Sequence, residues 1–161
     1  MKQLLSMFSA ILIFGGCAEK SAFDLFKMDA NQEKSVEQLR TGTILESMET
    51  KAILSAVYLN PVYPNEYKDG EYFIGAFYFQ KQYVDAKKWS LEDFGYRLTL
   101  NSSLPISMEE LKETDSRRLL IPIRNKWNRF YLIRFAPTAE TALTLKLEKD
   151  PTGSVELNYQ K

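Results

Sequence analysis

The clearest pattern of apolar and polar positions lies near the C-terminal end of the chain. Apolar residues occupy every second position twice, at Leu143, Leu145 and Leu147 and again at Val155, Leu157 and Tyr159. A period of two predicts strands with one buried face and one solvated face. The residues between them, 150–153 (DPTG), contain the proline and glycine that are typical of turns, so the segment is predicted to form a β-hairpin.

Five more segments are rich in β-branched and aromatic residues, which is the composition of strands. They are 51–60, 71–80, 96–101, 117–123 and 129–135. The stretch between the first two (PVYPNEYKDG) contains two prolines and an Asp-Gly pair, and it predicts a long loop. About seven short strands separated by turns indicate two packed antiparallel sheets. The expected fold is mainly β, an antiparallel β-sandwich that is immunoglobulin-like in outline.

Two segments carry helix signals. Residues 30–41 (ANQEKSVEQLRT) are rich in helix formers, and Gly42 follows them as a helix stop. Ser107 and Glu110 have the spacing of a capping box, which predicts one helical turn. The fold prediction therefore includes a short N-terminal helix before the strands.

The first sixteen residues have the order of a secretory signal. Lys2 is followed by an uncharged, mostly apolar run from Leu4 to Phe14 and then by two glycines. Eleven residues of helix rise only about 16 Å, well short of the roughly 30 Å hydrocarbon core of a bilayer. We therefore expect a cleaved signal peptide over residues 1–16.

The residues Phe14-Gly15-Gly16-Cys17 resemble the lipobox of bacterial lipoproteins. The resemblance implies that Cys17 receives a diacylglycerol on its sulfur and usually a third acyl chain, such as palmitate, on its new amino group. Ala18 follows, whereas an aspartate there resembles an inner-membrane retention signal, so the outer membrane facing the periplasm is favoured. The expected organisation is a signal peptide (1–16), a lipid anchor and short tether (17–28) and one β-sandwich domain (29–161). The alternatives are an ordinary cleaved signal that leaves Cys17 as a free thiol, or an apolar tail that is not cleaved.

Composition removes several classes of function. The chain contains no histidine, which excludes Ser-His and Cys-His nucleophiles, and its single cysteine makes a zinc site very unfavourable. The glycines of the mature part are isolated, so no phosphate-binding loop is expected. With 21 basic and 21 acidic residues there is no net charge to attract nucleic acid. No metal and no cofactor are therefore expected.

Acidic residues leave carboxylate chemistry open. The candidates are Asp69 with Glu71, Glu92 with Asp93, and the group Glu109, Glu110, Glu113 and Asp115. Such pairs could serve a glycosidase or hold calcium. Acids beside turns and helix starts are more often simply solvated, which is the reading we favour.

Aromatic and basic residues are the other candidates for contact. Tyr63 and Tyr67 lie in the predicted loop, where they could contact a glycan, a lipid or a partner. Phe73, Phe77 and Phe79 are instead expected in the core.

From Ser116 to Ala139 there are six basic residues and no acidic ones, beginning with Arg117 and Arg118. This stretch could meet anionic headgroups or an acidic partner, although a locally neutralised surface is favoured.

Together these features predict a noncatalytic, membrane-anchored envelope lipoprotein with a structural or protein-interaction role. Its partners would be the membrane, through Cys17, and an envelope protein or glycan. The alternatives are a glycan- or lipid-binding module, a lipoprotein that resembles those of secretion apparatus, and a carboxylate-dependent hydrolase of wall sugars. The secretion variant is supported by architecture alone, which does not carry function.

Overall fold

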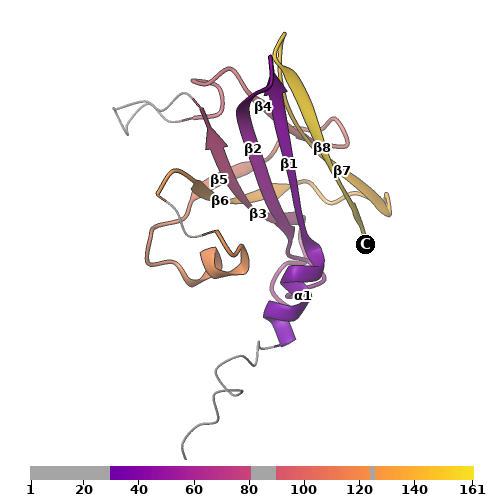
Figure 1. The fold of residues 1–161 in the computed structure, drawn as a ribbon. Coiled ribbons are helices and arrows are strands. Elements are labelled where there is room, and N and C mark those ends of the chain that lie inside the picture. The colour runs from indigo at the N-terminus through magenta and orange to yellow at the C-terminus, as the bar shows by residue number, and fades with distance from the viewer. Residues whose placement is uncertain (1–29, 81–89, 124–125) are drawn as a thin grey trace, which may run out of the picture.

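The computed structural model describes residues 30–80, 90–123 and 126–161 (Figure 1). In chain order the elements are α1 (Ala30–Gln38), β1 (Leu39–Glu46), β2 (Glu49–Tyr58), β3 (Glu71–Phe79), β4 (Arg97–Leu100), β5 (Ser107–Glu110), the 3₁₀ helix η2 (Ser116–Leu120), β6 (Arg129–Phe135), β7 (Ala142–Lys149) and β8 (Gly153–Gln160). The predicted signal peptide, anchor and tether lie outside these residues.

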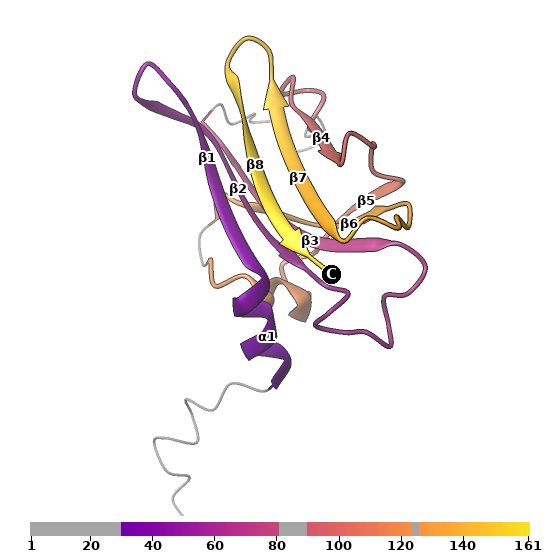
Figure 2. The ribbon, with the colours of Figure 1, turned by 90° about the vertical axis from the view of Figure 1, so that its right-hand side faces the viewer.

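Two antiparallel sheets face each other. One has the order β1-β2-β3-β6-β5 and the other the order β4-β7-β8. Figure 2 shows β7 and β8 in front of the larger sheet, with β1 alongside β8. The predicted mainly β fold, an antiparallel sandwich preceded by a short helix, is confirmed.

The main core fills the space between the sheets. Phe73 and Phe77 are 0% exposed and Phe79 is 1% exposed, as the sequence predicted for all three. The ring of Phe79 stacks on Phe94 and Tyr96, with centroids 4.7 and 4.6 Å apart. From the smaller sheet, every second residue of β7 enters this core, which confirms the predicted hairpin of β7 and β8.

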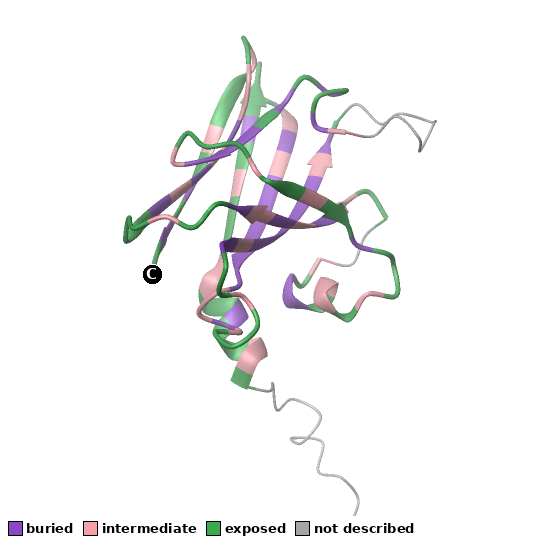
Figure 3. Cartoon of the chain, turned by 180° about the vertical axis from the view of Figure 1, so that it is seen from behind, coloured by how far each residue is buried: buried purple, intermediate pink, exposed green. Residues whose placement is uncertain are grey.

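A second, smaller core covers the outer face of the larger sheet. Val57 of β2, Ile74 of β3 and Phe130 of β6 pack there against Leu120 and Ile121, which lie at the end of η2. Both faces of β3 are therefore covered (Figure 3), which explains why its sequence is almost continuously apolar rather than alternating.

The helix is shorter than predicted. It ends at Gln38, and residues 39–46 (LRTGTILE) form β1, which pairs with β2 from Leu39↔Val57 onward. Gly42 is thus a strand residue rather than a helix stop. A Cβ at this position would lie 2.1 Å from Cγ2 of Val155 in β8, so glycine allows β1 to lie close to β8 here.

Two other local predictions are wrong. The predicted strand 117–123 is instead η2 with its following turn, because the Asp115 side chain accepts a hydrogen bond from the Arg117 backbone N–H and caps a helical turn. The predicted helical turn at Ser107–Glu110 is the edge strand β5. Its backbone pairs with β6, and these ladder hydrogen bonds replace those that a capping box would supply.

Candidate functional site

Cys17, the predicted lipidation site, lies outside the described residues. Of the other four predicted contact residues, Tyr63 and Tyr67 lie in the loop between β2 and β3, and Arg117 and Arg118 lie in η2. The structure therefore brings all four to the part of the molecule that covers the outer face of the larger sheet.

The two tyrosines form part of a small aromatic cluster. The backbone N–H of Tyr67 donates to the carbonyl of Tyr63 at 3.2 Å, and the two rings meet edge to face at 6.2 Å. Tyr67 also packs on Tyr72 of β3, with ring centroids 4.8 Å apart. Both loop tyrosines are half-buried, so part of each ring is covered by the protein. Stacking of a sugar ring on them is correspondingly restricted.

Arg117 is fully engaged within the protein. Its guanidinium donates to both oxygens of Asp115, with the shortest contact from Nη2 at 2.6 Å. This pairing raises the pKa of Arg117 and lowers the pKa of Asp115. Burial raises the pKa of the Tyr67 hydroxyl, while a hydrogen bond with Arg117 opposes that rise. Arg117 therefore joins η2 to the loop between β2 and β3 that carries Tyr63 and Tyr67, which we call the tyrosine loop.

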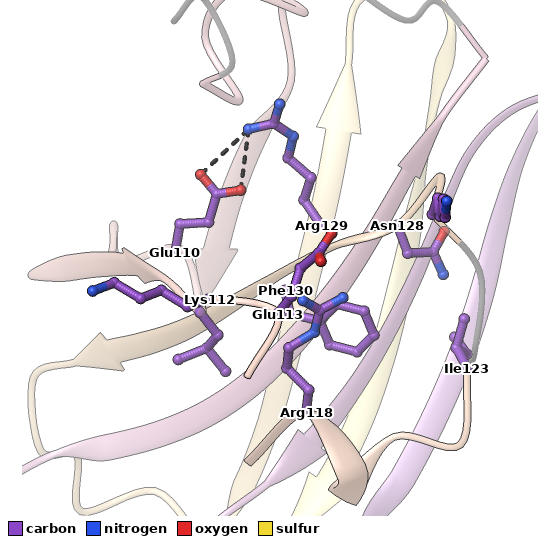
Figure 4. Close-up of a pocket in the computed structure, with 10 residues that line it drawn as sticks. Glu110, Lys112, Glu113, Arg118, Ile123, Asn128, Arg129 and Phe130 are labelled. Carbon is purple, nitrogen blue, oxygen red and sulfur yellow. Dashed lines mark hydrogen bonds and ion pairs between the residues drawn. The ribbon is translucent and has the colours of Figure 1, made fainter. Parts of the chain in front are cut away.

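Arg118 points elsewhere. Its guanidinium lies over the ring of Phe130 at 4.4 Å, a cation–π contact that holds the side chain in place. It lines a hollow of about 840 Å³ between the end of β5, η2 and the start of β6 (Figure 4). Lys112 and Lys126 line the same hollow.

The bases of this hollow are only partly neutralised by its acids. Arg129 donates to both oxygens of Glu110 at 3.1 and 3.3 Å, the pair marked in Figure 4. Glu113 is the other acid of the lining, against three further cations. The hollow is therefore mildly positive, and its chemistry suits an anionic ligand.

Three of the five bases of this stretch that the structure describes are paired with acids, in the direction that the sequence favoured. Arg117 pairs with Asp115 and Arg129 with Glu110, and Arg134 of β6 donates to Asp69 at 2.6 Å. Arg124 lies outside the described residues. Three of the acids that the sequence left open for catalysis, Asp69, Glu110 and Asp115, therefore serve as partners of these arginines.

One buried carboxylate was not predicted as such. Glu71, 3% exposed, accepts hydrogen bonds from the Tyr58 hydroxyl at 2.6 Å and from the Lys161 ammonium at 2.5 Å. Burial acts to raise the pKa of Glu71, but these bonds and one from the Thr138 amide outweigh it and lower that pKa. The alternation of side chains along a strand could have predicted this burial, because Glu71 lies two residues before Phe73 and therefore on the same inward face of β3. Asp69 instead pairs with Tyr72 and Arg134, so Asp69 and Glu71 do not act as a pair.

Within 30–80, 90–123 and 126–161, no three or more Asp, Glu, Cys or His side chains gather as a metal site would require. No helix in this part of the chain has the length and apolar character needed to cross a membrane. Comparisons with protein-family models, with curated proteins and with solved structures find no match.

Proposed function

We propose that this chain is a noncatalytic lipoprotein of the bacterial cell envelope, anchored by acyl chains on Cys17 and carrying its β-sandwich on the periplasmic side of the outer membrane. The observation that carries the proposal is the run Phe14-Gly15-Gly16-Cys17 directly after a charged start and an apolar segment. The role of the sandwich is to hold or contact another envelope component.

Acylation supplies enough membrane affinity for a lasting anchor. Each buried methylene contributes about 0.8 kcal/mol, and two or three chains together bind durably where a single chain binds only marginally. A free thiol at position 17 would offer none of this affinity, so lipidation and membrane residence should appear and disappear together.

Metabolic labelling with palmitate tests the anchor. The wild-type chain should incorporate label and sediment with membranes, and Cys17→Ala should lose both. The matched control is the double variant Cys17→Ala with Met48→Cys, which restores one cysteine at a fully exposed position away from the lipobox. Labelling of this control, or undiminished labelling of Cys17→Ala, would contradict the proposal.

The membrane assignment can be tested separately by density-gradient separation of the two membranes. The wild-type chain should be recovered with the outer membrane. Ala18→Asp introduces the residue that resembles the retention signal, and it should move the chain to the inner membrane. Recovery of the wild-type chain with the inner membrane would contradict the assignment and leave the anchor itself intact.

A second candidate function is a ligand-binding module, and the hollow beside Arg118 favours it. The guanidinium is held over the ring of Phe130 and lines the hollow. Retention of the chain on lipopolysaccharide or peptidoglycan would support this function, with Arg118→Gln reducing retention. Arg97→Gln is the control, because Arg97 is exposed and pairs with Glu148 within the smaller sheet, which does not line the hollow. Equal retention of both variants would count against the hollow as the site.

A further inference from the structure

One end of the sandwich is distinguished by where the chain leaves it. Figure 1 shows α1 at this end, with the loop between β2 and β3 behind it and the orange helix η2 beside it. Helix α1 contacts both β2 and η2, so its position on the sandwich is fixed by packing. The segment that leads back to Cys17 joins the described structure at Ala30, the first residue of α1.

The proposed anchor keeps this end close to the lipid. Cys17 lies thirteen residues before Ala30, a distance of at most about 45 Å when fully extended. A short tether of this kind gives the domain a millimolar effective concentration at the membrane surface. A contact too weak to bind a free protein is therefore sufficient to orient a tethered one.

The side chains at this end suit the interfacial region of a bilayer. Leu119 of η2 is 56% exposed and Val36 of α1 is 50% exposed. The half-buried tyrosines 63 and 67 lie in the adjacent loop, and tyrosine is enriched at membrane interfaces because its ring is apolar and its hydroxyl is polar.

The net charge of this surface is close to zero, because three exposed acids (Glu33, Glu37 and Glu66) are matched in number by three bases (Lys34, Lys68 and Arg118). The Asp115 carboxylate is paired with Arg117 at 2.6 Å and the Asp69 carboxylate with Arg134 at 2.6 Å. Pairing within the protein reduces the repulsion that free carboxylates would experience near anionic headgroups.

We infer that the surface formed by α1, η2 and the β2–β3 loop lies against the bilayer to which Cys17 is anchored, with Leu119 as its central apolar contact. This inference rests on the proposed function. The opposite end then points away from the lipid. It carries the turn between β1 and β2, which Figure 2 shows far from α1 and where Met48 is 100% exposed.

Single thiols placed at the two ends test the orientation. Cys17 is the only cysteine of the chain and is acylated in the proposal, so Leu119→Cys and Met48→Cys each add one labelling site. Each lipidated full-length variant is labelled with an environment-sensitive fluorophore and reconstituted into phosphatidylethanolamine–phosphatidylglycerol vesicles. Phospholipids brominated near the headgroup act as quenchers.

The label at position 119 should be quenched at least threefold more strongly than the label at position 48. Equal quenching, or stronger quenching at position 48, overturns the orientation while vesicle flotation of the same sample leaves the anchor standing. Failure of the lipidated chain to float with the vesicles overturns the anchor, and the orientation with it.

A second measurement separates contact from mere proximity. With the fluorophore at Val36→Cys, the additional change Leu119→Glu should reduce quenching at least twofold, because a carboxylate is poorly accommodated at the bilayer surface. The matched control is Met48→Glu, a charge added at the far end, which should leave quenching unchanged. An unchanged signal in the Leu119→Glu variant overturns the role of Leu119.

Discussion

Replacing Gly42 by alanine tests how the sandwich closes. In the native structure Gly42 of β1 faces Val155 and Leu157 of β8. An added Cβ would lie 2.1 Å from Val155 Cγ2 and 3.1 Å from Leu157 Cδ2. The first distance is far inside van der Waals contact, so either the Val155 side chain rotates or β1 and β8 move apart.

Two opposing effects set the size of the change. Alanine reduces the conformational entropy of the unfolded chain, which stabilises by about 0.4–1 kcal/mol where the native backbone suits it. Overpacking of a filled core costs about 1–3 kcal/mol. We therefore expect Gly42→Ala to lower the free energy of unfolding by about 1–2 kcal/mol.

Removal of the facing methyl groups isolates the clash. Val155→Ala takes away Cγ2, so in that background Gly42→Ala should be neutral or slightly stabilising. The coupling free energy between the two positions should then be about 1–2 kcal/mol, beyond the roughly 0.5 kcal/mol within which independent sites add.

The assay is urea unfolding followed by far-ultraviolet circular dichroism, on chains that carry Cys17→Ser so that no lipid is attached. All four members of the cycle should show the same slope of free energy against urea, as expected if only stability changes. Additive effects of the two substitutions would refute the idea that the two sheets meet at Gly42.

Three further substitutions probe the core. The pKa of Glu71 is lower in the folded protein than in the unfolded chain, so its carboxylate stabilises the fold above the ordinary carboxyl pKa, and this stability is lost as the pH falls through the folded pKa. In urea unfolding, the free energy of unfolding should therefore fall less between pH 7 and pH 3 in Glu71→Gln than in wild type. Equal falls in the two proteins would contradict this role of Glu71. Tyr159→Phe removes the hydroxyl that donates to the Ala56 carbonyl at 2.9 Å across the sandwich, and should cost about 1 kcal/mol in the same assay. Phe79→Ala empties the site stacked against Phe94 and should cost about 3–5 kcal/mol, so a loss below 1 kcal/mol would mean that the ring is not packed as described.

Segments whose local pattern agrees with their final environment were predicted correctly. The alternation in 142–149 matches a strand with one face on the core, and β7 occupies that range. The aromatic stretch 129–135 is likewise β6, with the predicted bounds. In both cases the side chains themselves encode which face is buried.

Segments where local propensity and tertiary pairing disagree were predicted wrongly. Residues 39–41 are compatible with continuing the helix, but pairing of β1 with β2 gives them ladder hydrogen bonds and buries Ile44. Ser107 and Glu110 match a helix start by their spacing, yet the edge of β6 offers them a partner strand. The position of the β6 edge depends on how the strands pack, so it cannot be predicted from the sequence of this segment alone.

The candidate site shows the same division. That Arg117 and Arg118 are cationic and that their stretch lacks acids was visible in the sequence. The two adjacent side chains diverge because η2 turns between them. Arg117 contacts Asp115 and Tyr67, and Arg118 contacts Phe130. The partners of Glu71 were equally hidden, since Tyr58 and Lys161 are distant from it along the chain.

The sequence by itself determined the mainly β class, the positions of most strands and the hairpin at the C-terminal end, and it contains the lipobox-like residues on which the proposed envelope location rests. These are local properties, carried by side-chain periodicity and by short motifs that need no knowledge of the rest of the chain. The tertiary structure alone decided the order of the strands, the second core over the larger sheet, the need for glycine at position 42 and the gathering of α1, η2 and the tyrosine loop at one end. Each of these depends on contacts between residues far apart in sequence, whose free energy exists only once the sheets have packed together.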